Sequence, residues 1–299
     1  MIFKGTATAL VTPFTEDDKV DVSSLERIVD DQIENGIDAL VVLGTTGEPA
    51  TMTAEEKEQA VKTVVRRAKG VVPVIVGAGS NDTKCAIRNC VFAQDLGADA
   101  VLVVTPYYNK CTQEGLVCHY GAIAEATSLP VLCYNVPSRT GVNLLPETFD
   151  TLLSKRFVQG VKEASGNMEQ IEKCVSVCKG RGDVISGDDA LTVPVTAMGG
   201  VGVISVASNV CPAFVSEMTR LALSGDFERA RSMQLALLPL ISALFCEVNP
   251  IPVKTAMQMR GLCSSRLRLP LTQMSGANAR KLESALKAFD DMLAKQRRL

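Results

Sequence analysis

The amino-acid sequence predicts an α/β fold of the TIM-barrel type, a closed (β/α)8 ring, followed by a C-terminal helical extension. Short β-branched runs alternate with amphipathic helical stretches in a regular rhythm, which is typical of parallel βα units. The rhythm repeats eight times and stops near residue 225, and the helical pattern beyond it is interrupted at Pro250, Pro252 and Pro270. We therefore expect a barrel domain over residues 1–225 and an extension over residues 226–299.

Eight short apolar segments are the predicted strands. In chain order they span residues 7–10, 39–43, 74–76, 100–104, 131–134, 159–162, 184–186 and 202–205. An open doubly wound sheet is the competing architecture, and periodicity by itself does not exclude it. Eight nearly equal units with no obvious reversal of order favour the closed barrel.

The helices between these strands have recognisable start and stop signals. The first is expected to end at Gly36. The second begins with a capping box at residues 53–56 and ends at Gly70, and the third closes at residues 95–97. Each helix therefore fits between two predicted strands, as a βα repeat requires.

Composition excludes several classes of function. The chain has 299 residues, 46% of them hydrophobic and 21% charged, with a formal net charge of -2 and a pI near 5.7. Because no basic stripe is available to neutralise phosphates, we do not expect a nucleic-acid partner. No apolar run is long enough for a membrane helix, and residues 1–5 do not resemble a signal peptide. We expect no membrane partner and a cytoplasmic location.

The cysteine and histidine content limits which side chains can act as catalytic groups or metal ligands. Of ten cysteines, the closest pair is Cys174 and Cys178 on one predicted helix, and there is no C-x-x-C, so we expect reduced, mostly buried thiols. The single histidine, His119, lies inside a predicted helix beside Tyr120. Sites built from several imidazoles are thus ruled out, and we expect no metal. Chemistry must come from Lys, Tyr, Thr, Arg or carboxylates.

Polar segments follow several predicted strands, at the barrel end where active sites of this fold lie. GTTGE (44–48) follows the second strand, TPYYN (105–109) the fourth, and YNVPSRTG (134–141) closes the fifth. Taken singly, each segment has an ordinary structural explanation. The first could be a tight turn, the second a pair of packing aromatic residues, and the third a loop with a surface cation. Three of the four tyrosines of the chain fall at these strand ends, however, which favours a common site.

Lys162 ends the sixth predicted strand, and most lysines are simply solvated surface residues. At the end of an apolar run, its amine could instead occupy a dry pocket that disfavours the ammonium form and leaves it free to attack a ketone. Such a nucleophile needs a carboxylate anchor for a keto acid, hydroxyls for proton transfer and exclusion of water. The polar segments offer each of these parts.

The motifs GTTGE, YNVPSRTG and GVKEASGN (160–167) resemble the dihydrodipicolinate synthase branch of the pyruvate-dependent class I aldolase and N-acetylneuraminate lyase family. The resemblance spans the chain through further motifs: ALVTPF (9–14), GDD (187–189), GVISVASN (202–209) and NPIPVK (249–254). It implies a homotetramer, a dimer of dimers, that condenses pyruvate with L-aspartate 4-semialdehyde in lysine (diaminopimelate) biosynthesis. It implies no metal or organic cofactor.

The resemblance also implies roles for single residues. Lys162 would form the imine with pyruvate, Tyr134 would lie beside it, and Thr45 with Tyr108 would complete a proton relay, Tyr108 coming from the neighbouring subunit. A protonated imine acidifies the pyruvate methyl group, so that an enamine carbon can add to the aldehyde.

Four further positions would bind substrate. Thr46 and the backbone N–H groups of its turn suit the pyruvate carboxylate, and Gly187 and Ile204 would bring backbone carbonyls close to the amine. Arg139 is typical of the synthase branch, where a guanidinium can hold the semialdehyde carboxylate with two parallel hydrogen bonds. Sialic acid lyases and sugar-acid aldolases lack it.

Three alternative functions remain open at this point. The chain could be another pyruvate aldolase that acts on a sugar acid, a phosphate-binding barrel with the glycines 199, 200 and 202, or a catalytically dead binding barrel. The retention of the whole set of candidate residues argues against a dead barrel.

Many synthases of this family are inhibited by L-lysine at a subunit interface. At the matching positions this chain keeps Asn81 and Tyr107 but has Pro49, Ala54, Lys57 and Cys85. Lys57 would repel an ammonium group, and Cys85 supplies no carboxylate for it. We therefore expect weak or absent lysine feedback.

Overall fold

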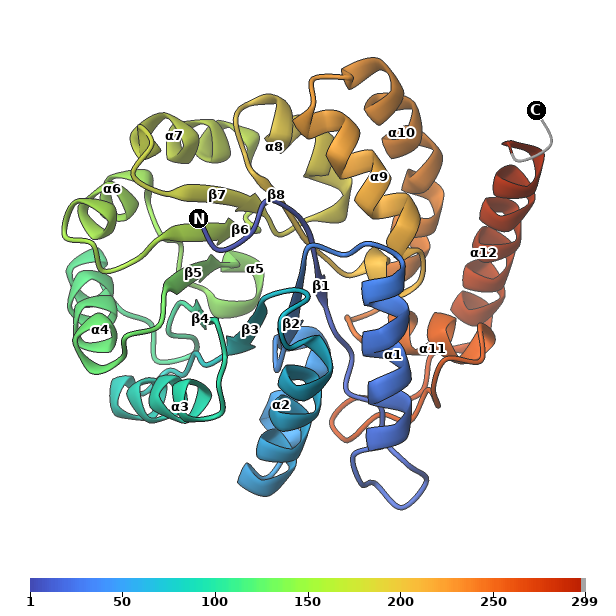
Figure 1. The fold of residues 1–299 in the computed structure, drawn as a ribbon, viewed down its shortest axis with the longest axis horizontal. Helices are drawn as coiled ribbons and strands as arrows, with labels where there is room; N and C mark the ends of the chain where they lie inside the picture. Colours follow the sequence, from blue (N-terminus) through green and yellow to red (C-terminus); the bar gives the residue numbers. More distant parts are fainter. Residues whose placement is uncertain (297–299) are drawn as a thin grey trace.

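The computed structural model describes residues 1–296, and within them the chain forms a closed barrel of eight parallel strands in the order β1 to β8 (Figure 1). The strands are β1 (Gly5–Ala9), β2 (Ala39–Val42), β3 (Val74–Gly77), β4 (Ala100–Val104), β5 (Val131–Asn135), β6 (Gly160–Glu163), β7 (Asp183–Ser186) and β8 (Gly202–Ser205). The predicted fold class is confirmed, and every predicted strand has a counterpart.

The predicted boundaries of β4 and β8 are the observed ones, and those of the other strands differ by one or two residues. β1 begins and ends earlier than residues 7–10, and β5 and β6 each continue one residue past the predicted end. β2 stops before Leu43, because Leu43 has a φ of 57° and leaves the extended conformation. These shifts place Tyr134 and Lys162 inside their strands, where pairing fixes their directions.

Closure of the barrel requires glycine where β8 meets β1. Gly202 pairs with Gly5 at the start of both strands. A Cβ on Gly202 would lie 1.8 Å from the carbonyl oxygen of Gly5, and Gly202 has a φ of 148°. Only glycine fits this approach.

The helices form a ring around the strands (Figure 1). The ring contains α1 (Val22–Glu34), α2 (Ala54–Ala68), α3 (Thr83–Asp95), α4 (Gln113–Ala126), α6 (Pro146–Ser154), α7 (Met168–Cys178), α8 (Thr192–Ala197) and α9 (Pro212–Leu223). Short helical segments follow four strands: η1 (Thr45–Gly47) and η2 (Pro49–Thr51), α5 (Pro137–Thr140), η3 (Asp189–Leu191) and η4 (Ala207–Asn209). The capping box at Thr53 and Glu56 is present and starts α2 as predicted.

Two apolar layers surround the strand backbones, because successive side chains of a strand point to opposite faces. The inner layer fills the barrel and includes Ala7, Val41, Leu102, Tyr134 and Ile204. The outer layer packs the other faces of the strands against the helices. The barrel centre is therefore a packed core, and the open space lies at its end.

The chain continues past the barrel in α10 (Phe227–Leu244), α11 (Ile251–Met259) and α12 (Gly276–Gln296). α12 packs against α10 and α11, to one side of the ring (Figure 1). We propose the division into a barrel over residues 1–225 and an extension over residues 226–299. None of the helices within residues 1–296 combines the length and the hydropathy that crossing a membrane would need.

Candidate active site

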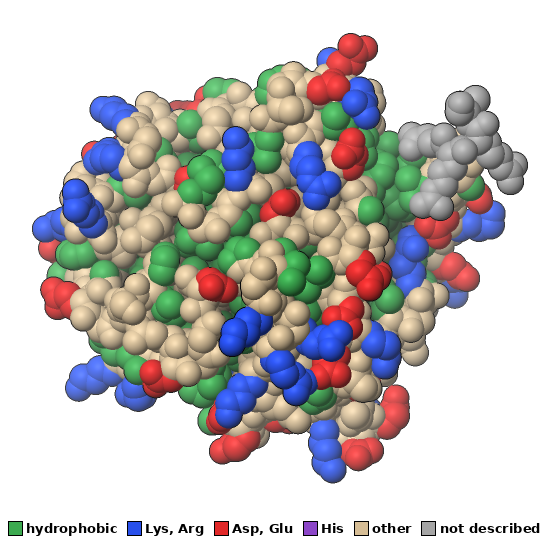
Figure 2. All heavy atoms as spheres, in the orientation of Figure 1, with side chains coloured by type: hydrophobic (Ala, Val, Ile, Leu, Met, Phe, Trp, Pro, Cys, Tyr) green, Lys and Arg blue, Asp and Glu red, His purple; other side chains and the backbone are tan. Residues whose placement is uncertain are grey.

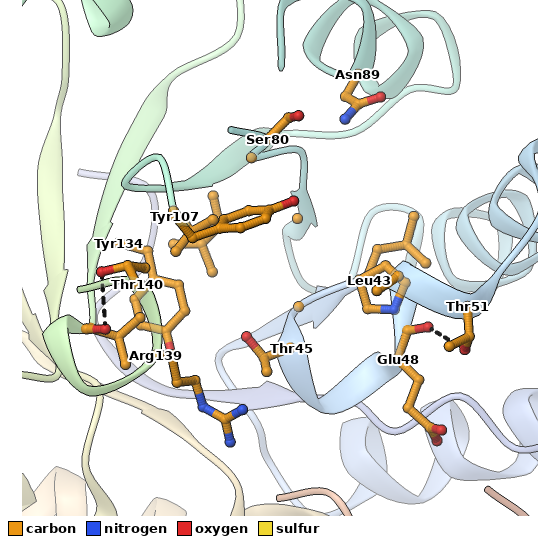
Figure 3. A pocket seen from close by; sticks show the side chains of 18 of the residues that line it. Leu43, Thr45, Glu48, Thr51, Ser80, Asn89, Tyr107, Tyr134, Arg139 and Thr140 are labelled. Carbon is orange, nitrogen blue, oxygen red and sulfur yellow. Dashed lines mark hydrogen bonds between the residues drawn. The ribbon is translucent and has the colours of Figure 1, made fainter. Parts of the chain in front are cut away.

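A cavity of about 490 Å³ opens at the C-terminal end of the barrel (Figure 3). Its walls come from the segments after β2, β3, β4 and β5 and from the extension at residues 248–250 and 270–271. Thr45, Tyr107, Tyr134 and Arg139 line it. The structure thus gathers side chains from three of the polar motifs around one space.

The GTTGE segment forms the short η1 turn directly after β2. Thr12 Oγ1 donates a hydrogen bond to the Gly47 carbonyl oxygen over 2.7 Å, and Asn249 Nδ2 donates to Thr46 Oγ1 over 3.0 Å. Thr45 faces the cavity, whereas Thr46 is buried beside it. Leu43 and Glu48, at the two ends of the segment, both have left-handed φ angles, 57° and 54°. Such backbone persists only where surrounding contacts hold it.

Glu48 is held by a buried ion pair with the extension. Lys254 Nζ lies 2.7 Å from Glu48 Oε1, and the two side chains are 0% and 2% exposed. The ammonium also donates to the Arg266 carbonyl oxygen and lies 4.3 Å from the centre of the Phe14 ring. Burial lowers the pKa of Lys254, and the carboxylate of Glu48 opposes that shift. The pair connects the GTTGE segment to α11.

Tyr134 and Lys162 are paired residues on the neighbouring strands β5 and β6. Lys162 Nζ lies 4.3 Å from the centre of the Tyr134 ring, a cation–π distance. Lys162 is 6% exposed, and among residues 1–296 its amine has no carboxylate partner. Tyr134 lines the cavity, whereas Lys162 does not, and the contact with the Tyr134 ring is what connects the amine to the cavity. A lysine shielded from bulk water thus lies next to a side chain of the cavity wall.

Gly187 directly follows β7 and Ile204 lies in β8, the two strands that follow Lys162 around the barrel. A Cβ on Gly187 would lie 3.1 Å from Lys162 Cε, so this glycine leaves the room that the lysine side chain occupies. Ile204 is buried in the same inner layer as Tyr134. The structure therefore brings Gly187 next to the lysine and Ile204 into the layer below the cavity.

Arg139 lies in α5, a single helical turn that follows β5. Its Nη2 donates a hydrogen bond to the Asn249 carbonyl oxygen over 3.3 Å. Figure 3 shows the side chain extending from α5 toward the segment that contains Thr45. A guanidinium at this place can bind the carboxylate of a ligand in the cavity.

The three remaining candidates differ in their placement. Tyr107 reaches over the cavity beside Tyr134 (Figure 3). Tyr108 is 90% exposed, has a φ of 70° and is absent from the cavity wall of its own chain. The Asn81 carbonyl oxygen accepts a hydrogen bond from Asn109, which links the loops before α3 and α4. One chain by itself therefore does not bring Tyr108 to Lys162.

Sequence reasoning missed the residues that hold the strand ends together. Glu163, next to Lys162, points to the outer face of the barrel and is 1% exposed. Its carboxylate accepts hydrogen bonds from Asn135 Nδ2, Gln170 Nε2 and the Ser165 amide. This network joins β5 to β6 on the face opposite Tyr134 and Lys162. A buried charged residue directly after the lysine was the available signal.

A second missed group joins the ends of β7 and β8. The buried carboxylate of Asp189 accepts hydrogen bonds from the Val206 and Ala207 amides and from Ser205 Oγ. Burial raises the pKa of Asp189 and these hydrogen bonds oppose the shift. Asp189 and Asn249 lie in the motifs GDD and NPIPVK, for which the sequence suggested no role for these two residues.

Within residues 1–296, no cluster of His, Cys, Asp and Glu side chains has the arrangement of a metal site.

Comparison with known proteins decides the family. Residues 2–289 match the model of the dihydrodipicolinate synthetase family. The chain belongs to this family. It is 50% identical over 286 residues to a 4-hydroxy-tetrahydrodipicolinate synthase of Alkaliphilus oremlandii, covering 96% of this chain and 98% of that protein.

Solved structures of synthases in this family have the same fold. The dihydrodipicolinate synthase of Thermotoga maritima superposes with a TM-score of 0.95 at 45% identity, covering 97% of this chain and 99% of that one. A dihydrodipicolinate synthase variant described as monomeric gives 0.95 at 45% identity, covering 97% of each chain. The family resemblance expected from the motifs is confirmed over nearly the whole chain.

Proposed function

We propose that this chain is a 4-hydroxy-tetrahydrodipicolinate synthase, a lyase that condenses pyruvate with L-aspartate 4-semialdehyde in the diaminopimelate route to lysine. The observation that supports it best is the contact of Lys162 with Tyr134, which lines the same cavity as Arg139. An imine-forming amine, a phenol and a second carboxylate site are the parts that this reaction needs.

The chemistry follows from these positions. The Lys162 amine attacks the pyruvate ketone and water leaves, giving an imine whose protonated form draws electrons from the methyl group. Loss of a methyl proton gives an enamine, and its carbon adds to the aldehyde carbon of the second substrate. Tyr134 lies against the amine, so it is placed to carry protons to and from the reacting atoms, with Thr45 on the same cavity wall.

Two carboxylate sites complete the proposal. Thr46 and the amides of the η1 turn bind the carboxylate of pyruvate, while Arg139 binds that of the semialdehyde. Gly187 supports the site by leaving space around Lys162, and the carbonyls of Gly187 and Ile204 face the amine. No metal or organic cofactor takes part in this scheme.

Labelling tests the proposed nucleophile. Treating the protein with pyruvate and sodium borohydride should add the reduced pyruvyl group to Lys162, detected by peptide mass mapping. Lys254 is an internal control, since it is also buried but is paired with Glu48. An unmodified Lys162, or equal labelling of Lys254, would contradict the mechanism. An assay with aspartate semialdehyde against sugar-acid aldehydes then identifies the acceptor.

Assembly is the part of the proposal that extends beyond one chain. Tyr108 is a nearly fully exposed aromatic residue at the rim of the site, held in a left-handed conformation. We propose that it enters the site of a neighbouring subunit in a homotetramer made of two dimers.

The ten cysteines are all free, which supports a reducing compartment, and we propose a cytoplasmic location.

The outer part of the cavity bears on regulation. Pro49, Lys57, Cys85 and Tyr107 line it, and Lys57 is the cation among them that would meet a ligand's ammonium group. We propose that L-lysine inhibits weakly or not at all. Steady-state rates with lysine titrated into the assay measure this, and inhibition at micromolar lysine would contradict it.

A further inference from the structure

Asn249 lies where the extension meets the active site. It is 7% exposed, lines the cavity and precedes α11. Its side-chain Nδ2 donates to Thr46 Oγ1 over 3.0 Å, and its backbone carbonyl oxygen accepts from Arg139 Nη2 over 3.3 Å. One residue therefore contacts both side chains that are assigned to the two substrate carboxylates.

The direction of the first hydrogen bond has a chemical consequence. An amide NH2 group only donates, so the Thr46 oxygen is the acceptor and its own hydroxyl proton is left for another partner. Among residues 1–296, nothing else accepts that proton. A carboxylate accepts hydrogen bonds and cannot donate them when ionised. Asn249 thus keeps Thr46 in the state that suits an incoming carboxylate.

The other amide atom shows that this contact is specific. Asn249 Oδ1 is buried and has no hydrogen-bond partner within the described residues. Among residues 1–296, Thr46 is thus the only polar partner of the side chain. An unsatisfied buried acceptor does not stabilise a fold, so removal of the amide should cost little stability. A single hydrogen bond to Thr46 and an unpaired oxygen indicate a role in the candidate site and not in the stability of the fold.

We propose that Asn249 is a positioning residue that acts on the two substrates through different atoms. Its side-chain amide orients the Thr46 hydroxyl toward the pyruvate carboxylate, and its backbone carbonyl holds the Arg139 guanidinium for the semialdehyde carboxylate. The inference rests on the proposed synthase function. It gives the C-terminal extension a direct part in substrate binding.

Because substitutions change only the side chain, the two effects can be separated. Asn249→Ala should raise the KM for pyruvate, and the pyruvate concentration that half-saturates borohydride labelling, roughly tenfold, the loss expected for one hydrogen bond to a charged group. The KM for the semialdehyde should stay within about twofold, since the carbonyl at position 249 remains. Unchanged pyruvate binding, or an equal rise for both substrates, would overturn the proposal.

Asn249→Asp tests the direction of the hydrogen bond. Aspartate has nearly the same shape but only accepts, so the Thr46 proton would turn toward it and away from pyruvate. We expect pyruvate binding at least as weak as in Asn249→Ala, because the new charge also repels the pyruvate carboxylate. Asn249→Leu fills nearly the same space without a donor and should weaken pyruvate binding as much as Asn249→Ala, whereas a role limited to filling space would leave its KM for pyruvate unchanged. Asn278→Ala is the matched control. Asn278 Nδ2 holds Glu247 over 2.7 Å in the same extension, away from the cavity, and both KM values should be unchanged.

A double-mutant cycle with Thr46→Val separates an effect through Thr46 from a general loss of packing. Thr46→Val alone should weaken pyruvate binding, and Asn249→Ala in that background should add nothing. Additive effects would overturn the proposal. Circular-dichroism melting confirms that each variant is folded. Labelling of the unmodified protein at Lys162 is measured in parallel, so that failure of the synthase function is distinguished from failure of this inference.

Discussion

Two lysines, Lys162 and Lys254, are buried in the described part of this chain, and their surroundings assign them opposite roles. Lys254 faces a carboxylate at 2.7 Å and is neutralised as a structural ion pair. Lys162 faces an aromatic ring and has no carboxylate partner among residues 1–296. A buried amine without an anion is available for chemistry, because no ion pair has to be broken before it reacts.

Arg139 should distinguish the two substrates. Arg139→Ala removes a guanidinium from the cavity but leaves the Lys162 and Tyr134 contact intact. We expect the KM for aspartate semialdehyde to rise roughly tenfold to a hundredfold, as for loss of charged hydrogen bonds, with a much smaller change for pyruvate. Steady-state kinetics with each substrate varied in turn measures this. An equal loss for both substrates would reject the assignment.

His119 should make stability depend on pH. It is buried in α4, its Nδ1 is 2.9 Å from Thr83 Oγ1, and its Nε2 has no partner among the described residues. Burial lowers the pKa of His119, with a smaller opposing effect from Asp82. The unfolded chain then binds the proton more readily, so stability is complete above about pH 6.5 and falls below it.

Thermal melting between pH 5 and 7 measures this effect. His119 is the only histidine, so His119→Gln should flatten the Tm profile in that window. A slope that survives the substitution would assign the pH dependence to carboxylates instead.

At the scale of elements, the GTTGE segment depends on contacts from both ends of the chain. Thr12 follows β1, while Asn249 and Lys254 belong to the extension. The left-handed residues Leu43 and Glu48 show why such support is needed, since a short turn with this backbone is unfavourable by itself. The extension thus holds one wall of the candidate site in place as well as packing against the barrel.

The ion pair between Glu48 and Lys254 allows a stability test of this support. Lys254→Met leaves a buried carboxylate without its cation, and we expect a loss of about 3 kcal/mol in the free energy of unfolding. Urea denaturation measures it. The double variant Glu48→Gln with Lys254→Met should recover part of the loss, because no charge is then left buried. If the single variant is as stable as the unmodified protein, the pair does not anchor the segment.

At the scale of the whole molecule, the low net charge and the mixed surface charges are consistent with an enzyme that acts on small molecules. Figure 2 shows Lys and Arg side chains interspersed with Asp and Glu over the visible face, with no basic stripe there. The exposed Tyr108 is a feature of the surface that a single barrel leaves unexplained. The proposed oligomer explains it, since a neighbouring site would cover the ring.

Hybrid oligomers test whether Tyr108 acts across subunits. Co-expression of Lys162→Ala with Tyr108→Phe creates, in the hybrid, one site with an intact lysine and a tyrosine from the partner chain. We expect activity well above either variant alone. Lys162→Ala with Tyr134→Phe is the matched control, since Tyr134 pairs with Lys162 within one chain and no intact site can form. Recovery in the control, or none in the first pair, would contradict the arrangement.

The sequence by itself determined the fold class, the eight strands and the family, because strand and helix periods and short motifs are local properties of the chain. It also singled out Lys162, Tyr134, Thr45 and Arg139 as neighbours, since strand ends of a barrel meet at one edge. Several observed strand ends differ from the predicted ones by a residue or two. At Leu43 the reason is a left-handed backbone, which depends on contacts that the local sequence does not show.

Only the tertiary structure decided which side chains hold these residues in place. Asn249 contacts Thr46 from 203 positions away in the sequence, and Lys254 contacts Glu48 from 206 positions away. No local period or spacing encodes such contacts, since they depend on how the extension folds back onto the barrel. The same holds for Tyr108. Its high exposure and its absence from the cavity wall of its own chain are properties of the folded structure. Local patterns determine the elements, and packing between distant segments determines the site.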